Sequence, residues 1–415
     1  MYIEKNDALL HKIYDKAIQL VKDEHEGFRL SLEITALEGV SSYEIEVNDK
    51  DIHIKALDEA SAFYGLVEVL KSTTPQSVQH STHVAERGLH VDMGRKFYSL
   101  NWFKSVIEKM AEFKLNMLQM HVSENLGFRF ESKKFPDIVS EEHLTQDEIK
   151  EIIAYAKQYY IDVIPSFDSP GHLEKVLSHY PEYQLEGNKT GLDITNMEAR
   201  KFIKDIYDEI LDVFSDAKII HMGGDEFINF AEYDKYPQLE AYAQKHFAEH
   251  AKGSDTYIDF INDVSSYLQA KGLEVRVWND GLYRLDQNEI VELNKDVVIT
   301  YWTSWEKNMA PLSRFVEKGH RVVNYNDSFL YYVLGECAGY KYPTYEKIAD
   351  GFDFSVFPYR NQQVEGETLQ KLDVKDPQYI GGFFSIWSDE PKAQTEQEVF
   401  DKFIPALQAF ANKAW

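Results

Sequence analysis

The chain has 415 residues, of which 44 are Lys or Arg and 70 are Asp or Glu, so its formal net charge is −26. A hydrophobic content of 44% and a charged content of 27% are typical of globular proteins and exclude a disordered or fibrous chain. The acidic excess argues against nucleic acid and anionic membranes as partners, because both are bound by clustered Lys and Arg. The unusual figure is the aromatic content of 14%.

Residues 1–80 predict a small α+β domain. A helical pattern covers residues 7–22, and strands with alternating polarity follow at 28–34, 43–49 and 51–57. A second helical pattern covers 58–71, and the polar residues 72–83 predict a linker.

Targeting and redox signals are weak. The first twenty residues lack the apolar stretch of a secretory signal, and no window approaches the roughly 20 apolar residues of a membrane span. The single cysteine, Cys337, excludes an internal disulfide. We therefore expect a cytoplasmic protein that does not engage a membrane.

Residues 84–415 predict a (β/α)8 TIM barrel. Eight short apolar runs alternate with amphipathic helical segments, and the runs cover residues 87–93, 117–123, 162–168, 218–226, 274–280, 296–302, 321–327 and 379–387. One of the helical segments opens with a capping pair, Thr145 and Glu148. An open doubly wound sheet shares this alternation. However, that fold usually places a glycine-rich phosphate turn after its first strand, where this chain reads MGRKFYSLNWF.

Two adjacent acids, Asp225 and Glu226, follow Gly223 and Gly224 where the fourth strand should end. Two neighbouring carboxylates repel each other, which predicts that the pKa of at least one of them is raised. A protonated acid beside an ionised one suits glycoside hydrolysis. The alternative is a surface pair without a function.

Tryptophans gather near the same strand ends. Trp278, Trp302, Trp305 and Trp387 lie at or just after predicted strands, whereas Trp102 and Trp415 are assigned structural roles. Indole faces pack against the C–H faces of sugars, so several rings at one barrel end predict a sugar pocket rather than core packing alone.

Histidines offer a competing interpretation. His90, His121, His172 and His221 lie near four strand ends, with Asp168 and Asp225 close in sequence, as a metal-dependent hydrolase would require. No pair has the HxH or HxxxH spacing of metal ligands. We therefore expect supporting roles for these histidines, and neither a metal nor a cofactor.

Three motifs, RGLHVDMGR, PSFDSPGH and HMGGDE, occur in this order on the first, third and fourth predicted strands. Together they resemble glycoside hydrolase family 20, the β-N-acetylhexosaminidases, over residues 84–415, and the first domain looks like the α+β domain that precedes the barrel in that family. The resemblance implies an exo-acting retaining enzyme that removes terminal β-linked GlcNAc or GalNAc from glycans. In such enzymes the substrate's own acetamido oxygen attacks the anomeric carbon and forms an oxazolinium intermediate.

By the same resemblance, Glu226 is the general acid and then the general base, and Asp225 accepts the acetamido N–H. Tyr331 or Tyr332 would bond to the acetamido carbonyl. The resemblance assigns substrate binding to Arg87, Asp168, His172, Trp278, Trp302, Trp387 and Asp389, and supporting roles to His121, Glu124 and His221.

One motif departs from the family pattern. Many members read HxxDDQ after the second strand, whereas this chain reads HVSENLG, so that Glu124 stands in place of an aspartate and Leu126 in place of the glutamine. Two other functions remain open: a lacto-N-biosidase-type enzyme of the same family that releases a disaccharide, and a non-catalytic sugar-binding barrel.

Overall fold

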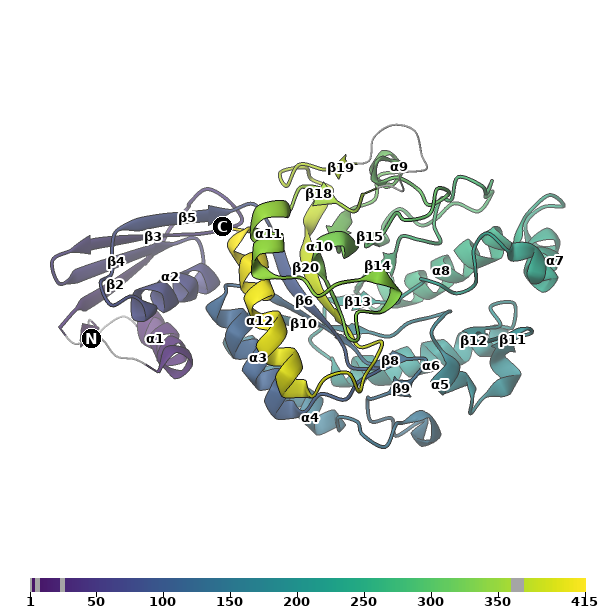
Figure 1. The fold of residues 1–415 in the computed structure, drawn as a ribbon, viewed down its shortest axis with the longest axis horizontal. Coiled ribbons are helices and arrows are strands. Elements are labelled where there is room, and N and C mark those ends of the chain that lie inside the picture. The colour runs from purple at the N-terminus through teal and green to yellow at the C-terminus, as the bar shows by residue number, and fades with distance from the viewer. Residues whose placement is uncertain (1, 4–7, 23–26, 360–368) are drawn as a thin grey trace.

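The computed structural model describes residues 2–3, 8–22, 27–359 and 369–415. The N-terminal unit and the barrel lie at opposite ends of the long axis of the molecule, and helix α12 (Glu396–Asn412) runs along the side of the barrel near that unit (Figure 1). Within the described residues, no helix combines the length and the apolar character needed to cross a bilayer.

The N-terminal unit is a five-stranded sheet with two helices. The strand order is β1-β2-β4-β3-β5, with bounds Tyr2–Ile3, Arg29–Ile34, Asp51–Ala56, Ser41–Asn48 and Val78–Thr82. Helices α1 (Ala8–Val21) and α2 (Glu59–Lys71) pack on each other and cover one face (Figure 1). The Asp58 side chain begins α2 by accepting the backbone N–H of Ser61 at 2.7 Å.

The linker prediction is wrong in part, because residues 78–82 form strand β5 and pair antiparallel with β3. This edge strand contributes few buried side chains, so its pairing rests on backbone hydrogen bonds that leave little hydrophobic pattern in the sequence. The N-terminal sheet therefore extends to Thr82.

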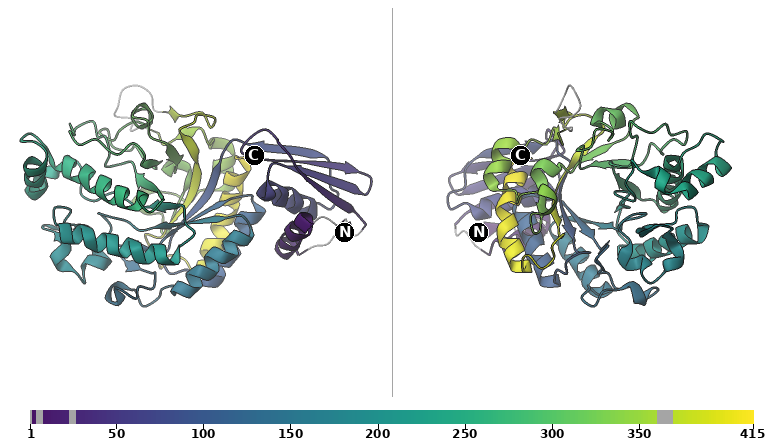
Figure 2. Two further views of the ribbon diagram at one scale, coloured as in Figure 1. Left: turned by 180° about the vertical axis from the view of Figure 1, so that it is seen from behind. Right: turned by 45° about the vertical axis from the view of Figure 1, so that its right-hand side comes forward.

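The barrel prediction is confirmed. Eight parallel strands follow in the order β16-β15-β14-β13-β10-β7-β6-β20, and pairing of β16 with β20 closes the ring, which excludes an open sheet (Figure 2). Their bounds are β6 Glu86–Asp92, β7 Met117–His121, β10 Asp162–Ser166, β13 Ile219–His221, β14 Glu274–Trp278, β15 Val298–Tyr301, β16 Val322–Asn324 and β20 Tyr379–Trp387.

Amphipathic helices surround the ring. Besides α12, the longer ones are α3 (Leu100–Glu112), α4 (Gln146–Gln158), α6 (Met197–Val213), α7 (Pro237–His246) and α8 (Gly253–Gln269), and the shorter ones are α9 (Leu312–Glu317) and α11 (Tyr345–Gly351). Two of these pack on other helices instead: α7 on α8 and α11 on α12. The predicted capping box of α4 is present, because Thr145 and Glu148 each accept the other's backbone N–H.

Short elements fill the connections between strands and helices. They are β8 Ser123–Glu124, β9 Gly127–Phe128, α5 Glu174–Leu177, β11 Gln184–Leu185, β12 Asn188–Leu192, α10 Asp327–Leu330, β17 Tyr331–Val333, β18 Val356–Phe357 and β19 Gln370–Lys371, together with single 3-10 turns at Pro136–Ile138, Pro181–Tyr183, Tyr233–Lys235 and Cys337–Gly339. Strand β17 pairs in parallel with the carboxyl end of β20.

A polar cluster joins the N-terminal unit to the barrel. The carboxylate of Glu68 on α2 accepts from His80 at 3.1 Å and pairs with Lys114, just after α3, at 3.0 Å. The Tyr43 hydroxyl donates to the same carboxylate, and its ring lies 5.8 Å from that of Trp415 at the end of the chain. The structure thus gives Trp415 a place at this junction.

We predict that Glu68→Gln destabilises the protein at neutral pH. Burial alone would raise the pKa of Glu68, but hydrogen bonds from His80 and Tyr43 and the charge of Lys114 lower it to about 2. A depressed folded-state pKa stabilises the fold above the unfolded value and loses this effect as pH falls toward 2. With the side chain 30% exposed, we expect a loss of about 1–2 kcal/mol at pH 7.

Urea unfolding at pH 7 and at pH 3.5 measures this loss, which should shrink at the lower pH. Glu38→Gln, at an exposed position of the same unit, is the control and should change little. A loss that is equal at both pH values would contradict the role of the Glu68 charge.

Candidate active site

A cavity of about 450 Å³ opens at the carboxyl ends of the barrel strands, where barrel enzymes hold their active sites. Acidic, basic and aromatic side chains from several different strand ends meet in it. Its lining residues are Arg95, Glu124, His172, Asp225, Glu226, Trp278, Trp302, Trp305, Asp327, Tyr331, Val333, Ala338, Gly339, Tyr340, Trp387 and Asp389.

The acid pair follows β13, and the two glycines before it are required by the backbone. Gly223 and Gly224 have φ values of +78° and +96°, and a Cβ at Gly223 would lie only 2.4 Å from Oδ1 of Asp168. The turn gives the two acids different environments. The Asp225 side chain is 11% exposed, whereas that of Glu226 is 53% exposed and projects into the cavity.

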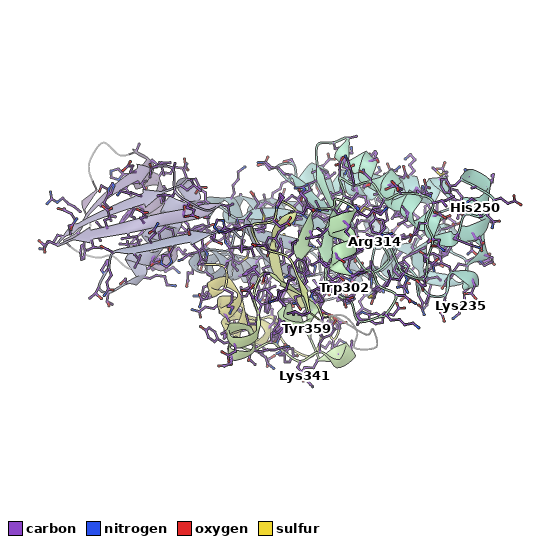
Figure 3. All side chains as sticks on the ribbon, turned by 90° about the horizontal axis from the view of Figure 1, so that it is seen from above. Lys235, His250, Trp302, Arg314, Lys341 and Tyr359 are labelled. Carbon is purple, nitrogen blue, oxygen red and sulfur yellow. The ribbon has the colours of Figure 1, made fainter. Side chains whose placement is uncertain are left out.

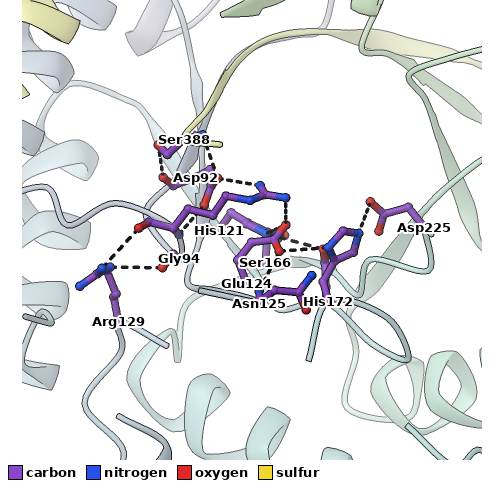
Figure 4. Close-up of polar contacts among 12 residues, drawn as sticks. Asp92, Gly94, His121, Glu124, Asn125, Arg129, Ser166, His172, Asp225 and Ser388 are labelled. Atoms are coloured by element: carbon purple, nitrogen blue, oxygen red, sulfur yellow. Dashed lines mark hydrogen bonds and ion pairs between the residues drawn. The ribbon is translucent and has the colours of Figure 1, made fainter. Parts of the chain in front are cut away.

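A chain of alternating charges leads to this pair, and Figure 4 shows its part from Glu124 through His172 to Asp225. Arg95 contacts Glu124 at 2.8 Å, and Glu124 accepts from Nδ1 of His172 at 3.0 Å. The other ring nitrogen of His172 lies 3.4 Å from a carboxylate oxygen of Asp225 and 3.4 Å from one of Glu226. Glu124, which departs from the family pattern, therefore still connects the arginine to the histidine.

The charges in this chain shift one another's pKa values. Burial opposes a charge on His172, but Glu124 and Asp225 raise its pKa well above the ordinary value. The hydrogen bond and charge of His172 in turn lower the pKa of Glu226. The expected rise in pKa is therefore not met at Glu226, because the hydrogen bond and charge of His172 outweigh burial and the charge of Glu124.

Two buried carboxyl groups behind the acid pair have raised pKa values. Burial, and then the charge of Asp225, raise the pKa of Asp168 to about 8 against the opposing effect of His121. Burial, Asp225 and Glu226 raise the pKa of Asp280 to about 7. Both side chains are almost fully buried, and neither lines the cavity.

Aromatic rings form the walls of the cavity, and imidazoles support them from behind. The ring of His221 lies 4.4 Å from Trp278, and the ring of His90 lies 4.4 Å from Trp387. Burial lowers the pKa of both histidines, so they pack as neutral rings. Trp302 stands parallel to Tyr331 at 5.9 Å and 2°, on the barrel and away from the N-terminal unit (Figure 3).

Several buried polar atoms of cavity residues have no partner within the described part of the chain. They include Oδ1 of Asp225, the hydroxyl of Tyr331 and the indole nitrogens of Trp278 and Trp387. Buried polar groups are rarely left unsatisfied, so these atoms indicate that a ligand supplies the missing hydrogen bonds.

The two tyrosines after the seventh strand are now distinguished. Strand β17 pairs Tyr331 with Ser385 and Tyr332 with Ile386, so the two side chains point to opposite faces. Tyr331 lines the cavity, whereas the Tyr332 hydroxyl donates to Gln394 outside it.

The prediction for Arg87 is wrong. Arg87 lies at the start of β6, at the end of the barrel opposite the cavity, and donates to the backbone carbonyls of Lys114 at 2.9 Å and Val84 at 2.7 Å. The cavity arginine is Arg95, the second arginine of the same motif, which follows the carboxyl end of β6. Asp168 was also predicted to bind substrate, but its burial places it behind the site.

The other predicted residues do come together at this end of the barrel. Asp389 and the three predicted tryptophans line the cavity, and His121 lies behind it, 3.6 Å from carboxylate oxygens of Glu124 and Asp168. Sequence reasoning assigned no role to Asp280, Asp327 or Tyr340. Asp280 follows β14 and Asp327 follows β16, and a position just after a barrel strand is itself a signal of a site residue. Tyr340 lies in a connection that carries no such signal.

A metal could find donors here. Ligand atoms of His121, Glu124 and Asp168 lie within 4.8 Å of one another, as do those of Asp168, His172 and Asp225. Burial would lower the pKa of His121, but Asp168, Glu124 and Asp92 raise it to about 9. The expectation that no metal takes part stays a prediction.

Comparison with known proteins assigns the family. The catalytic-domain profile of glycosyl hydrolase family 20 matches residues 85–415. The chain belongs to this family. It is 28% identical over 98% of its length to a lacto-N-biosidase from Bifidobacterium bifidum, covering 36% of that protein. It is also 23% identical over 90% of its length to a β-hexosaminidase from Vibrio vulnificus, covering 53% of that protein.

Solved structures of family 20 enzymes share the fold. The exo-β-N-acetylglucosaminidase from Vibrio harveyi in complex with N-acetylglucosamine superposes with a TM-score of 0.76 at 19% identity, covering 100% of this chain and 69% of that one. The β-N-acetylhexosaminidase from Bacteroides fragilis also gives 0.76, at 22% identity, with 100% and 86% covered. The chain spans about a third to about half of the length of the two curated relatives named above.

We predict that His172→Asn moves the basic limb of the pH profile of kcat/KM to higher pH. That limb reports the pKa of an acid that must be protonated in the free enzyme. His172 lowers the pKa of Glu226, so its removal raises that pKa. We also expect the maximum to fall about tenfold or more, because Glu226 loses a contact that orients it.

A chromogenic N-acetyl-β-glucosaminide serves for this measurement. His179→Asn, at an exposed position, is the matched control and should leave the profile in place. A basic limb that moves to lower pH would show that His172 does not set the protonation of the acid.

Proposed function

We propose that this chain is an exo-acting retaining β-N-acetylhexosaminidase that removes terminal β-linked GlcNAc or GalNAc from glycans by substrate-assisted catalysis. The observation that carries the proposal is the division within the acid pair. Glu226 is exposed to the cavity, whereas Asp225 is buried and keeps Oδ1 without a partner among the described residues. The Tyr331 hydroxyl is a second unpartnered group of the same cavity.

These groups match the two ends of an acetamido substituent. Oδ1 of Asp225 would accept its N–H and orient it, while the Tyr331 hydroxyl would donate to its carbonyl oxygen. That oxygen then attacks the anomeric carbon and forms an oxazolinium ion, whose positive charge the Asp225 carboxylate stabilises. No protein nucleophile is needed in this scheme.

Glu226 performs the proton transfers. As the C–O bond to the leaving group breaks, its carboxyl donates a proton to the departing oxygen. In the second step its carboxylate accepts a proton from water, which attacks the anomeric carbon and reopens the ring. The hydrogen bond and charge of His172 keep the pKa of Glu226 low, and a sugar that covers the side chain would raise that pKa by desolvation.

The walls suit a neutral sugar. The indoles that line the cavity offer flat faces to the C–H groups of a pyranose, and Arg95 and Asp389 offer polar groups for its hydroxyls. The cavity of about 450 Å³ falls within the range of small-molecule sites. Trp305, which is 53% exposed, extends the aromatic wall outward from this space.

We predict that the 2-acetamido group of the substrate is essential. The wild-type protein should hydrolyse an aryl N-acetyl-β-glucosaminide and leave the matching aryl β-glucoside nearly untouched. Asp225→Asn should lower kcat on the first substrate about 10²–10³-fold, since it removes the carboxylate that faces the developing charge. Release of the aryl group measures both.

Glu226→Gln keeps the shape of the acid but cannot donate its proton. It should lower kcat at least as much as Asp225→Asn, so each acid of the pair is tested by its own variant. Equal hydrolysis of the β-glucoside by the wild type would contradict participation of the acetamide. Unchanged turnover by Glu226→Gln would remove it as the acid.

The size of the released sugar is the next prediction. We expect release from a chromogenic GlcNAc glycoside, as the proposed exo-acting function requires. The matching lacto-N-biose glycoside is the comparison, chosen because a lacto-N-biosidase is among the similar proteins. Release from the disaccharide glycoside alone would replace the proposed activity with a disaccharide-releasing one. Release from neither would favour a non-catalytic sugar-binding barrel.

A further inference from the structure

We propose that Asp280 is a positioning residue that holds the acid Glu226 and the cavity wall Trp302 in fixed relation to each other. This inference rests on the proposed function, because it concerns the orientation of the acid in that reaction. Asp280 itself touches no substrate, since it is 2% exposed and lies behind the cavity lining.

Each carboxylate oxygen of Asp280 serves a different neighbour. Oδ2 accepts the backbone N–H of Glu226 at 3.1 Å, and Oδ1 accepts the indole N–H of Trp302, also at 3.1 Å. Asp280 follows β14, whereas its two partners follow β13 and β15, the strands on either side. One carboxylate therefore ties together three adjacent strand ends.

The residue before Asp280 secures the same turn. The Asn279 side chain accepts the backbone N–H of Trp302 at 2.9 Å and donates to the carbonyl of Thr303 at 2.8 Å. Asn279 is fully buried. The Trp302 indole is thus fixed through both its backbone and its ring nitrogen, and the β14 turn supplies both contacts.

Glu226 needs such a contact more than its neighbours do. Its φ of +44° lies in the left-handed region, which residues with a side chain seldom occupy unless surrounding contacts impose it. Its side chain is half exposed, and the nearest ring nitrogen of His172 is 3.4 Å away. The hydrogen bond from its backbone N–H to Asp280 therefore fixes the residue at the point from which the catalytic side chain projects.

Asp280→Asn is a conservative test of this role. The replacement keeps the shape but turns one of the two acceptor oxygens into an N–H donor, so the side chain can accept from Glu226 or from Trp302 but no longer holds both together. The buried carboxyl faces Asp225 and Glu226, which with burial raise its pKa to about 7, so a neutral amide is compatible with the fold. We expect a folded variant with a misdirected acid.

Two substrates separate misdirection of the acid from general damage. The 2,4-dinitrophenyl glycoside of GlcNAc has a leaving group that departs without protonation, whereas N,N′-diacetylchitobiose needs the acid. The values of kcat/KM for the two report bond cleavage, and their ratio isolates acid assistance. Asp280→Asn should raise the ratio of the first to the second at least tenfold over the wild type.

A merely structural role would lower both values together and leave this ratio unchanged, and that result would overturn the proposal. Asp296→Asn, at an exposed position of the same connection between β14 and β15, is the matched control and should match the wild type. If Asp280→Asn does not fold, the same ratio measured on Asp280→Ser decides the question in the same way.

The Trp302 contact has its own readout. A thiazoline mimic of the oxazolinium intermediate reports the shape of the wall without needing the acid. Asp280→Asn should weaken its binding several-fold, and the effect should be smaller in a Trp302→Phe background, where the indole N–H is already absent. Equal effects in both backgrounds would overturn the link to Trp302.

Failure of the proposed function gives a different pattern. A wild-type protein that cleaves neither GlcNAc substrate would overturn the proposed function and this inference together. An active wild type with an unchanged ratio in Asp280→Asn overturns only the role of Asp280.

Discussion

The alternation of buried charges from Arg95 through Glu124 to His172 is the interaction on which the site depends. Unpaired carboxylates in a water-poor site would become protonated or destabilise the fold. The two cations allow Glu124 to remain ionised and allow Asp225 and Glu226 to stand side by side. Two carboxylates can therefore occupy adjacent positions, one buried and one exposed to the cavity.

The barrel makes this alternation possible because parallel strands deliver their carboxyl ends to one rim. Arg95, Glu124 and His172 follow three neighbouring strands, β6, β7 and β10, and the acid pair follows the next, β13. The aromatic walls continue around the ring from β14 to β20. The interior beneath them is filled by neutral histidines against the indoles, so the cavity has a packed floor.

Sequence reasoning predicted the elements better than their contacts. Eight apolar runs sufficed for the barrel, and the glycines before Asp225 marked the turn that presents the acid pair, because both signals are local. Arg87 was misassigned although it begins its strand, and the rule that barrel sites lie at the carboxyl ends would have selected Arg95. The choice between Tyr331 and Tyr332, and the contacts of Asp280, depend on pairing between distant segments, which no local pattern encodes.

The acidic character of the chain extends into the cavity, where acids outnumber cations. Glu124, Asp225, Glu226, Asp327 and Asp389 line it, against the two cations Arg95 and His172. The net charge of −26 reflects mainly the solvated surface, but this local excess repels anions at the site itself. A neutral amino sugar avoids that repulsion and uses what the cavity offers, which is flat aromatic faces and acids that accept from N–H and O–H groups. The aromatic excess and the acidity of the chain thus favour the same kind of substrate.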